Sequence, residues 1–372
     1  MNANWDAVVI GAGPAGSIAA RQLALRGTKV LLVDKAAFPR PKVCGCCIND
    51  HALSTLRSVG LLARILKLDA VPLRMMRLAT PSAHADVPLE AGVCLSRGAF
   101  DQSLVEAACE VGAVFLPSTE AVVGDETHDG WDIRLGSDAV QARVVVVAAG
   151  LRPQSIRDPD EAEPGSRIGA GTLVDAAPDF YRRHVVHMAC GAEGYVGIVQ
   201  LEDGRWNIAA ALDRDAVRRA SGPGSLATQV VDQVGWPAIP GLEKSEWRGT
   251  VTLTRHPRRV WNRRMFLVGD AAGYVEPFTG EGIAWALASG AACVPWALRA
   301  IDRWDDELGE GWARMHQRLI GDRQRLCRTA SRVLRSPFWS AAAIHAVRLI
   351  PWLASPVLRR LNAPSRFERA MP

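Results

Sequence analysis

Three glycines near the start of the chain are the residues best suited to chemistry. Gly11, Gly13 and Gly16 have the spacing GxGxxG and lie between an apolar run that ends at Ile10 and a segment of helical periodicity. Glycines in this context let a diphosphate approach the backbone N–H groups at a helix N-terminus. Asp34 ends the next apolar run, where a carboxylate accepts hydrogen bonds from ribose hydroxyls. The pattern predicts a site for an adenine dinucleotide.

The residues around these glycines fit the same site. Gly11 permits a tight turn out of the strand, and Gly16 allows the helix to pack closely on that strand. Pro14 suits the first helical turn, because the N–H group that it lacks would have no partner there. The dinucleotide is therefore expected against Gly11, Gly13, Pro14, Ala15, Gly16, Asp34 and Lys35.

A group of cysteines supplies the second candidate chemistry. Cys44 follows a proline-rich loop that contains Arg40 and Lys42, and Cys46 and Cys47 come directly after it. Neighbouring cations lower the pKa of a thiol and make it reactive. Cys44 is therefore a candidate catalytic residue, with a small buried packing residue as the alternative. The sequence contains no second Cys/His cluster of matching spacing, so we predict no metal site.

Hydrophobic periodicity predicts the elements that position these groups. Apolar runs rich in β-branched residues are typical of buried parallel strands, whereas the middle of the chain is typical of a mostly antiparallel sheet. We predict an α/β (α+β) fold, in which a Rossmann-like dinucleotide-binding domain is interleaved with a sheet-rich substrate domain. The expected segments are 1–72, 98–158 and 258–300 for the first domain, 73–97 and 159–257 for the second, and 301–372 for a C-terminal helical region.

Composition and charge exclude several classes of protein. With 48% hydrophobic and 22% charged residues, the chain of 372 residues is typical of a globular protein. The net charge of +5 is modest and accompanies no basic stripe with interleaved aromatics, so nucleic acid is not an expected partner. No run of ~18 apolar residues predicts a membrane span. The first strand leaves no room for a signal peptide and the eight cysteines show no disulfide framework, so we expect a cytoplasmic protein.

Four motifs in order make the chain resemble a single-Rossmann FAD-dependent oxidoreductase. The first is the glycine loop with Asp34; the others are Arg97 with Phe100-Asp101, the pair Gly269-Asp270, and the loop 277–283. The superfamily that it resembles contains aromatic monooxygenases similar to para-hydroxybenzoate hydroxylase, geranylgeranyl reductases and flavin-dependent halogenases. The resemblance implies that the dinucleotide is FAD and that the loop 277–283 lies against its isoalloxazine ring.

The same resemblance implies further cofactor contacts. Arg97 is expected to touch the cofactor and Asp270 its ribityl chain. The sequence has no second GxGxxG, so a nicotinamide nucleotide, NADH or NADPH, is expected to bind only transiently as electron donor. The remaining expected contacts with FAD are Arg40, Cys44, Gly45, Gly150, Gly269, Pro277, Gly280, Glu281, Gly282 and Ile283.

Two enzymatic reactions stay open. The first is monooxygenation of a hydrophobic aromatic, polyketide or lipid-like small molecule. The alternative is reduction of C=C bonds, because Lys42-Val43-Cys44-Gly45 resembles the Lys-x-Cys-Gly loop of geranylgeranyl reductases, with Cys44 as proton donor. Tyr195 fits the tyrosine of their sheet motif and is a second candidate catalytic residue, although the tryptophan, phenylalanine and proline of that motif are missing. A non-catalytic electron-transfer flavoprotein is a third hypothesis, which no iron–sulfur spacing supports.

The C-terminal tail is rich in arginine. Twelve arginines follow Gly311, whereas Asp322 and Glu368 are the acidic residues there, and tryptophans and aliphatic residues are interleaved with them. Basic amphipathic helices of this kind suit a peripheral contact with a membrane surface, or a lid over a lipid-like ligand. The alternative is a helical layer packed on the FAD-binding domain with solvated arginines. The sequence predicts no particular oligomeric state.

Overall fold

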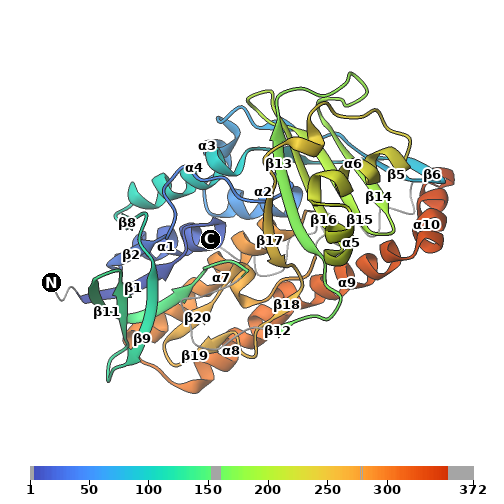
Figure 1. Cartoon of the computed structure of the whole chain (residues 1–372). Helices are drawn as coiled ribbons and strands as arrows, with labels where there is room; N and C mark the ends of the chain where they lie inside the picture. The colour runs from blue at the N-terminus through green and yellow to red at the C-terminus, as the bar shows by residue number, and fades with distance from the viewer. Residues whose placement is uncertain (1–3, 152–160, 277, 279, 351–372) are drawn as a thin grey trace.

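The computed structural model describes residues 4–151, 161–276, 278 and 280–350. Two large sheets dominate it, one at each end of an elongated molecule, and helices lie along and between them (Figure 1). The α/β (α+β) fold with a Rossmann-like sheet is thereby confirmed. The domain boundaries given above stay a prediction.

The first sheet has eight strands and carries the glycine loop. Its strands are β1 (Asn4–Ile10), β2 (Val30–Val33), β8 (Val114–Leu116), β9 (Ala121–Glu126), β10 (Trp131–Leu135), β11 (Asp138–Val147), β19 (Trp261–Asn262) and β20 (Met265–Leu267). The order is β19-β20-β11-β1-β2-β8, and β10 and β9 extend it from β11 as an antiparallel flap. β20, β11, β1, β2 and β8 run parallel, so their carboxyl ends meet at one edge. Ligands of open α/β sheets bind at that edge.

Helices α1 (Pro14–Ala24), α4 (Arg97–Cys109) and α7 (Gly282–Asp302) pack on this sheet and on one another. A Cβ on Gly290 of α7 would lie 2.2 Å from the Ala15 carbonyl oxygen of α1, so only glycine permits this close approach. Among the described residues, α7 is also the one helix long and apolar enough to cross a membrane. Because 78% of its apolar window is buried inside the protein, α7 is a core helix.

The second sheet has seven strands and faces the first across the middle of the molecule (Figure 1). Its order is β17-β13-β16-β15-β14-β5-β6, and every pair is antiparallel except β14 with β5. The strands are β5 (Met75–Thr80), β6 (Ala83–Pro88), β13 (Ile168–Val174), β14 (Val185–Gly191), β15 (Gly194–Gln200), β16 (Trp206–Leu212) and β17 (Arg248–Thr252). One face packs against α6 (Pro223–Gln233), which follows the short α5 (Arg214–Arg219). The other face is left for the cavity described below.

Smaller elements join the two sheets. Strands β3 (Cys47–Asn49), β4 (Val71–Pro72) and β7 (Gly92–Cys94) form a three-stranded sheet, and β12 (Glu161–Ala162) pairs with β18 (Arg255–His256). Helices α2 (Asp50–Ser58) and α3 (Leu62–Leu66) follow the cysteine loop. Beyond α7 come α8 (Asp306–His316), a π-helical turn (Gln317–Gly321), α9 (Asp322–Arg335) and α10 (Pro337–Leu349). The predicted C-terminal helices are thus present as far as they are described, and residues 351–372 lie outside the described residues.

Candidate functional site

The glycine loop has the geometry that a dinucleotide requires. Gly11 has a φ of +102°, and a Cβ there would lie 2.3 Å from the Ala148 carbonyl oxygen. At Gly16 a Cβ would lie 1.9 Å from the Gly11 carbonyl oxygen, so there is no room for a side chain between the helix and the turn. A Cβ on Gly13 would meet only Arg40 Nη2, at 3.5 Å, so there is free space in front of the Gly13 backbone on the side of the arginine. The loop is a cradle that side chains would fill.

Asp34 holds this loop in place. Its Oδ2 accepts a hydrogen bond from the Ala12 N–H group at 2.8 Å, and its Oδ1 accepts one from the Ala36 N–H group at 2.9 Å. Arg40 Nη2 lies 3.6 Å from the same carboxylate. Asp34 therefore shapes the cradle as well as presenting an acceptor at the ribose position. Lys35, the next residue, is exposed.

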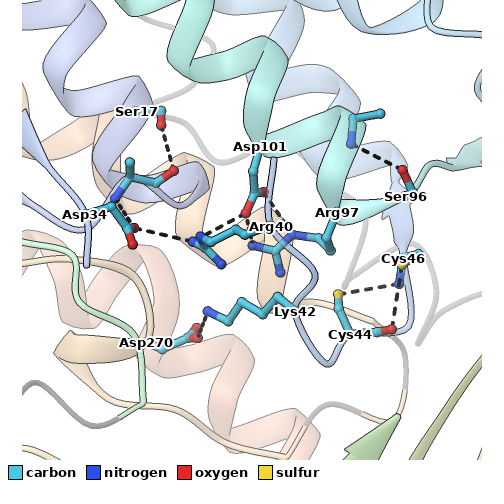
Figure 2. A network of polar contacts seen from close by, with 12 residues as sticks. Ser17, Asp34, Arg40, Lys42, Cys44, Cys46, Ser96, Arg97, Asp101 and Asp270 are labelled. Carbon is cyan, nitrogen blue, oxygen red and sulfur yellow. Dashed lines mark hydrogen bonds and ion pairs between the residues drawn. The ribbon is translucent and has the colours of Figure 1, made fainter. Parts of the chain in front are cut away.

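Arg97 and Arg40 share one buried carboxylate (Figure 2). Arg97 donates to Asp101 through Nε at 2.9 Å and Nη2 at 2.7 Å, and Arg40 Nη2 lies 3.5 Å from Asp101 Oδ2. Asp101 is fully buried, so the two arginines balance its charge where water cannot. The buried Nε of Arg40 has no hydrogen-bond partner among the described residues. A cation with a donor to spare beside an open glycine backbone fits the diphosphate of a dinucleotide.

Lys42, which was expected beside Cys44 but not among the contacts with FAD, also lies at the site. Its Nζ lies 3.7 Å from Asp270 Oδ2, and both residues lie near Arg40 (Figure 2). A Cβ on Gly150 would lie 3.4 Å from that same Nζ, so Gly150 borders the lysine. The N–H group of Gly269 donates to Ser289 of α7 at 2.9 Å and thereby ties the Gly269-Asp270 turn to that helix. This hydrogen bond consequently fixes the position of Asp270.

The loop before α7 is anchored by Asn49. The Asn49 Nδ2 group donates to Glu281 Oε1 at 2.8 Å, and the Asn49 Oδ1 atom caps α2 by accepting from the Ala52 N–H group. Gly280 has a φ of +76°, and Gly282 begins α7, so backbone N–H groups point out of the helix N-terminus. An anionic ring would be stabilised at this end of the helix. Pro277 lies outside the described residues.

Several of the predicted site residues line one cavity of about 230 Å³ between the two large sheets. Its mouth toward the glycine loop is formed by Pro14, Lys42, Cys44, Gly45, Arg97, Asp270, Gly280, Glu281, Gly282 and Ile283. The far wall is apolar and comes from the second sheet, with Met76, Val186, Met188, Val199 and Leu253 among its side chains. The cavity wall does not include Gly11, Gly13, Ala15, Gly16, Asp34, Lys35, Arg40, Gly150 and Gly269. The geometry suits a long cofactor whose reactive end meets an apolar substrate.

Cys44 and Cys46 form a coupled pair at the cavity wall. The Cys46 N–H group donates to Cys44 Sγ at 3.4 Å, and the Cys46 thiol lies 3.7 Å from the Cys44 carbonyl oxygen (Figure 2). Hydrogen bonding from Cys46 is the largest cause that lowers the pKa of Cys44; the Arg97 charge adds to it, and together they outweigh burial. The Cys46 pKa is raised in turn by the same bond and by burial. Cys44 is therefore the thiolate of the pair and Cys46 holds the proton.

Tyr195 lies in the cavity wall against a buried ion pair. Its ring packs edge-on against Phe278 at 5.2 Å between centroids, and Arg167 Cζ lies 5.7 Å from the ring. Arg167 Nη1 donates to Glu276 Oε1 at 3.2 Å, and both residues are almost fully buried. Burial raises the pKa of Tyr195, so its phenol stays protonated at neutral pH. His187, in contrast, belongs to an aromatic cluster on the opposite face of the second sheet and does not line the cavity.

Comparison with known proteins places the fold in a family. A family model described as an FAD binding domain matches residues 4–303. Digeranylgeranylglycerophospholipid reductase 1 of Methanothermobacter thermautotrophicus is 26% identical over 357 residues, covering 87% of this chain and 82% of that protein. The menaquinone reductase of Mycobacterium tuberculosis is 28% identical over 322 residues, covering 77% and 74%. The structure of the flavin-dependent brominase Bmp2 superposes with a TM-score of 0.79 at 16% identity, covering 96% of this chain and 93% of that one, and shows the shared fold.

Proposed function

Because the chain belongs to the FAD binding domain family, we propose that the protein, with FAD held at the glycine loop, reduces C=C bonds of a lipid-like molecule in the cavity. FAD is the cofactor, and the protein is an FAD-dependent oxidoreductase of the superfamily that includes geranylgeranyl reductases and flavin monooxygenases. The cradle, the unpartnered Arg40 Nε and the Lys42–Asp270 pair are the residues that fit this cofactor. The reduction of C=C bonds is the part that we propose beyond the cofactor and the enzyme class.

The observation that carries the proposal is the cysteine pair beside an apolar cavity. Saturating a C=C bond adds two hydrogens to neighbouring carbons, one as a hydride equivalent and the other as a proton. Reduced FAD supplies the hydride equivalent. The proton must come from a group that is held against the substrate and away from bulk water. The Cys44–Cys46 pair lines the cavity, and Cys46 keeps its proton beside the Cys44 thiolate.

The chain's own residues give this proton a route. Arg97 balances the charge of the Cys44 thiolate, so the proton that the pair gives up leaves from the Cys46 thiol, and solvent restores it afterwards. Cys44 is only partly buried, so it can reach both the cavity and the loop surface. The apolar wall excludes water from the rest of the cavity and accommodates hydrocarbon. Tyr195 is a second proton source in the same wall, because its phenol remains protonated.

The relatives support a lipid-like substrate. Two similar proteins are named for a digeranylgeranylglycerophospholipid and for menaquinone, and both names describe molecules with long hydrocarbon chains. Their identity to this chain is 26% and 28%, so the substrate of this protein is a proposal in its own right. Met76, Val186 and Met188 line the cavity with flexible and branched apolar side chains, which fits such chains.

Monooxygenation is the second candidate function. It is favoured by the departure from the prenyl-reductase sheet motif, since Tyr195 is present but is followed by Val196-Gly197-Ile198. A dry cavity next to the reactive end of FAD would also serve oxygen chemistry. The two candidates differ in the product, which gains two hydrogen atoms in one case and one oxygen atom in the other.

The test is a single-turnover reaction with the FAD-loaded protein. The protein is reduced anaerobically with dithionite and mixed with a geranylgeranyl-chain glycerophospholipid or with menaquinone in detergent. The mass of the product is measured by mass spectrometry. We expect substrate-dependent reoxidation of the flavin and a product that has gained two hydrogen atoms per saturated bond. Reoxidation that needs dioxygen and yields an oxygenated product would overturn the reductase proposal. NADH and NADPH are compared as reductants in the same assay to identify the electron donor.

A further inference from the structure

The outer face of α10 is an exposed apolar surface. Of the nine large hydrophobic side chains that are exposed among the described residues, five lie between Val333 and Ile350. Phe338 is 71% exposed, Trp339 62% and Leu349 69%, whereas Ile344 on the opposite side of the helix is buried. Phe338 and Trp339 are in mutual ring contact, with centroids 5.2 Å apart. We call Phe338, Trp339, Leu349 and Ile350 the α10 patch.

The α10 patch follows one side of the helix along its whole length. Residues three, four and seven positions apart share a helix face, and Phe338, Ala342 and Leu349 have that spacing. Trp339, Ala343 and Ile350 form the neighbouring row. All six of these residues are exposed. An apolar face that no other described element covers calls for a partner.

Charge indicates which partner it is. Between residues 323 and 350 the sequence has six arginines and neither aspartate nor glutamate. Arg332 and Arg348 are exposed and make no ion pair within the described part of the chain. Arginines next to exposed aromatic and aliphatic side chains match a bilayer surface with anionic headgroups, to which each cation is attracted.

The position of α10 connects this surface with the cavity. Ile344 packs on Ala83 and Ala85 of β6, with Leu78 of β5 beside them. Leu78 and Met76 lie two positions apart in β5, so both side chains point to the same face of the sheet, and Met76 lines the cavity. Figure 1 shows α9 running beneath the second sheet to α10, which stands beside β6 at the end of the molecule. The Ile344 side of α10 therefore covers the edge of the sheet face that forms the apolar cavity wall, and the α10 patch is on the outer side of the same helix.

The preceding helix anchors α10 to the site. Ser331 of α9 donates to the Glu276 carbonyl oxygen at 3.1 Å, and Arg335 Nη2 lies 3.7 Å from the Glu276 carboxylate. Glu276 directly precedes the loop 277–283. The helix that precedes α10 is thus bonded to Glu276, beside the loop that is expected against the cofactor.

We infer that the α10 patch docks on a bilayer that contains anionic phospholipids, so that a lipid-like substrate enters the cavity from the membrane. A second copy of the chain is a poorer occupant, because a two-fold contact through this face would place arginines of both copies against each other. The docking contact itself does not depend on the reaction. The entry of substrate from the bilayer rests on the proposed function.

The test measures co-sedimentation of the full-length, FAD-loaded protein with phosphatidylcholine vesicles, with and without phosphatidylglycerol. We expect binding only to the anionic vesicles and weaker binding at high salt. The double variants Phe338→Ser/Trp339→Ser and Arg332→Glu/Arg348→Glu should each bind about tenfold or more weakly. Leu25→Ser/Leu66→Ser, which removes two exposed leucines elsewhere, is the matched control and should bind like the wild type.

Other outcomes would overturn the inference. These are wild-type protein that ignores anionic vesicles, double variants that bind as the wild type does, or a dimer in sedimentation velocity that the α10 variants convert to monomer. Flavin content and circular dichroism show that each variant is folded. Turnover of detergent-solubilised substrate separates this contact from the reaction: we expect the α10 variants to keep it, whereas an error in the proposed function would abolish it for the wild type as well.

Discussion

The glycine loop and the apolar cavity adjoin each other but are built in opposite ways. The loop lies within residues 11–34, and its shape comes from backbone atoms that approach too closely for a side chain. The cavity wall is assembled from side chains of the second sheet, the cysteine loop and the start of α7. One added methyl group in the glycine loop should therefore prevent binding. A substitution in the cavity wall should instead change the chemistry of the cavity and leave the fold intact.

The comparison also separates binding from reaction. Much of what holds the dinucleotide cradle in shape lies within residues 11–34, such as Asp34 bonded to the Ala12 N–H group. The groups with chemistry, Cys44 and Tyr195, come from distant segments and meet only at the cavity. Changes in the loop should therefore remove FAD, and changes in the cavity should alter turnover while FAD stays bound.

The largest effect is expected from Gly16→Ala in the loop. The new Cβ would lie 1.9 Å from the Gly11 carbonyl oxygen, so α1 must move away from the turn that faces the diphosphate. We expect FAD affinity to fall more than ~100-fold, which corresponds to about 2.7 kcal/mol. Flavin absorbance per protein after gel filtration measures the loss. Gly249→Ala, where a Cβ would meet its nearest atom at 4.0 Å, is the control, and equal flavin content in the two variants would contradict the cradle.

Cys44→Ser addresses the cavity side of the comparison. Serine cannot share a proton at the pKa of a thiol, so turnover should fall about 100-fold while flavin content is unchanged. In the wild type the pKa of Cys44 is lowered to about 5, so alkylation of this thiol by iodoacetamide should rise through that pH and be constant near neutrality. Cys109→Ser, at the exposed end of α4, is the control. Unchanged turnover would mean that Cys44 is only a packing residue. Loss of FAD in this variant would show that the cavity residue also contributes to cofactor binding.

Much of the fold was predictable because its signals are local. The parallel strands of the first sheet were predicted from apolar runs and the turns from glycines, and the structure confirms both, as at Val30–Val33 and Gly11. FAD was predicted from four short motifs, and the family match confirms it. The sequence interpretation missed α5, which is only six residues long and too short for periodicity to be visible.

The polar contacts of the site were not predictable in the same way. Asn49 and Glu281 are 232 positions apart, and Lys42 meets Asp270 from the other end of the chain, so no spacing rule connects them. Arg97 and Asp101 lie four residues apart in α4, a spacing that permits their ion pair on one helix face, yet the second partner of Asp101, Arg40, depends on where the cysteine loop folds. The role of each residue toward FAD stays a prediction until a cofactor complex or a variant tests it.

Buried histidines offer a comparison of the stability of the two regions. His187 lies beneath the second sheet and His316 in α8 beside the first, and burial lowers the pKa of each to about 4. Below about pH 6.5 the unfolded chain binds protons that the folded chain refuses. Each histidine should therefore lower the unfolding free energy by up to about 1.4 kcal/mol per pH unit between about pH 6.5 and 4, with no effect above that range.

Urea unfolding at about pH 7 and about pH 5 checks this expectation. His187→Phe and His316→Phe should each show a smaller loss of stability between the two conditions than the wild type. His128, whose side chain is almost fully exposed, supplies the control His128→Gln, which should behave as the wild type does. If neither buried variant changes the pH dependence, acid sensitivity arises elsewhere in both regions.

The smallest effect is expected at Lys42, which lies between the two regions. Its Nζ pairs with Asp270 at 3.7 Å, but the side chain is 31% exposed, so solvent screens much of its charge. Lys42→Met should weaken FAD binding about threefold, because the cation adds attraction for the diphosphate, and the difference should shrink as salt is raised. Titration of the FAD-free protein at two ionic strengths measures it, with Lys67→Met on the outside of the molecule as control. Tighter FAD binding in Lys42→Met would contradict this expectation. It would mean that the lysine competes with the ribityl chain for Asp270 and so opposes the binding of FAD.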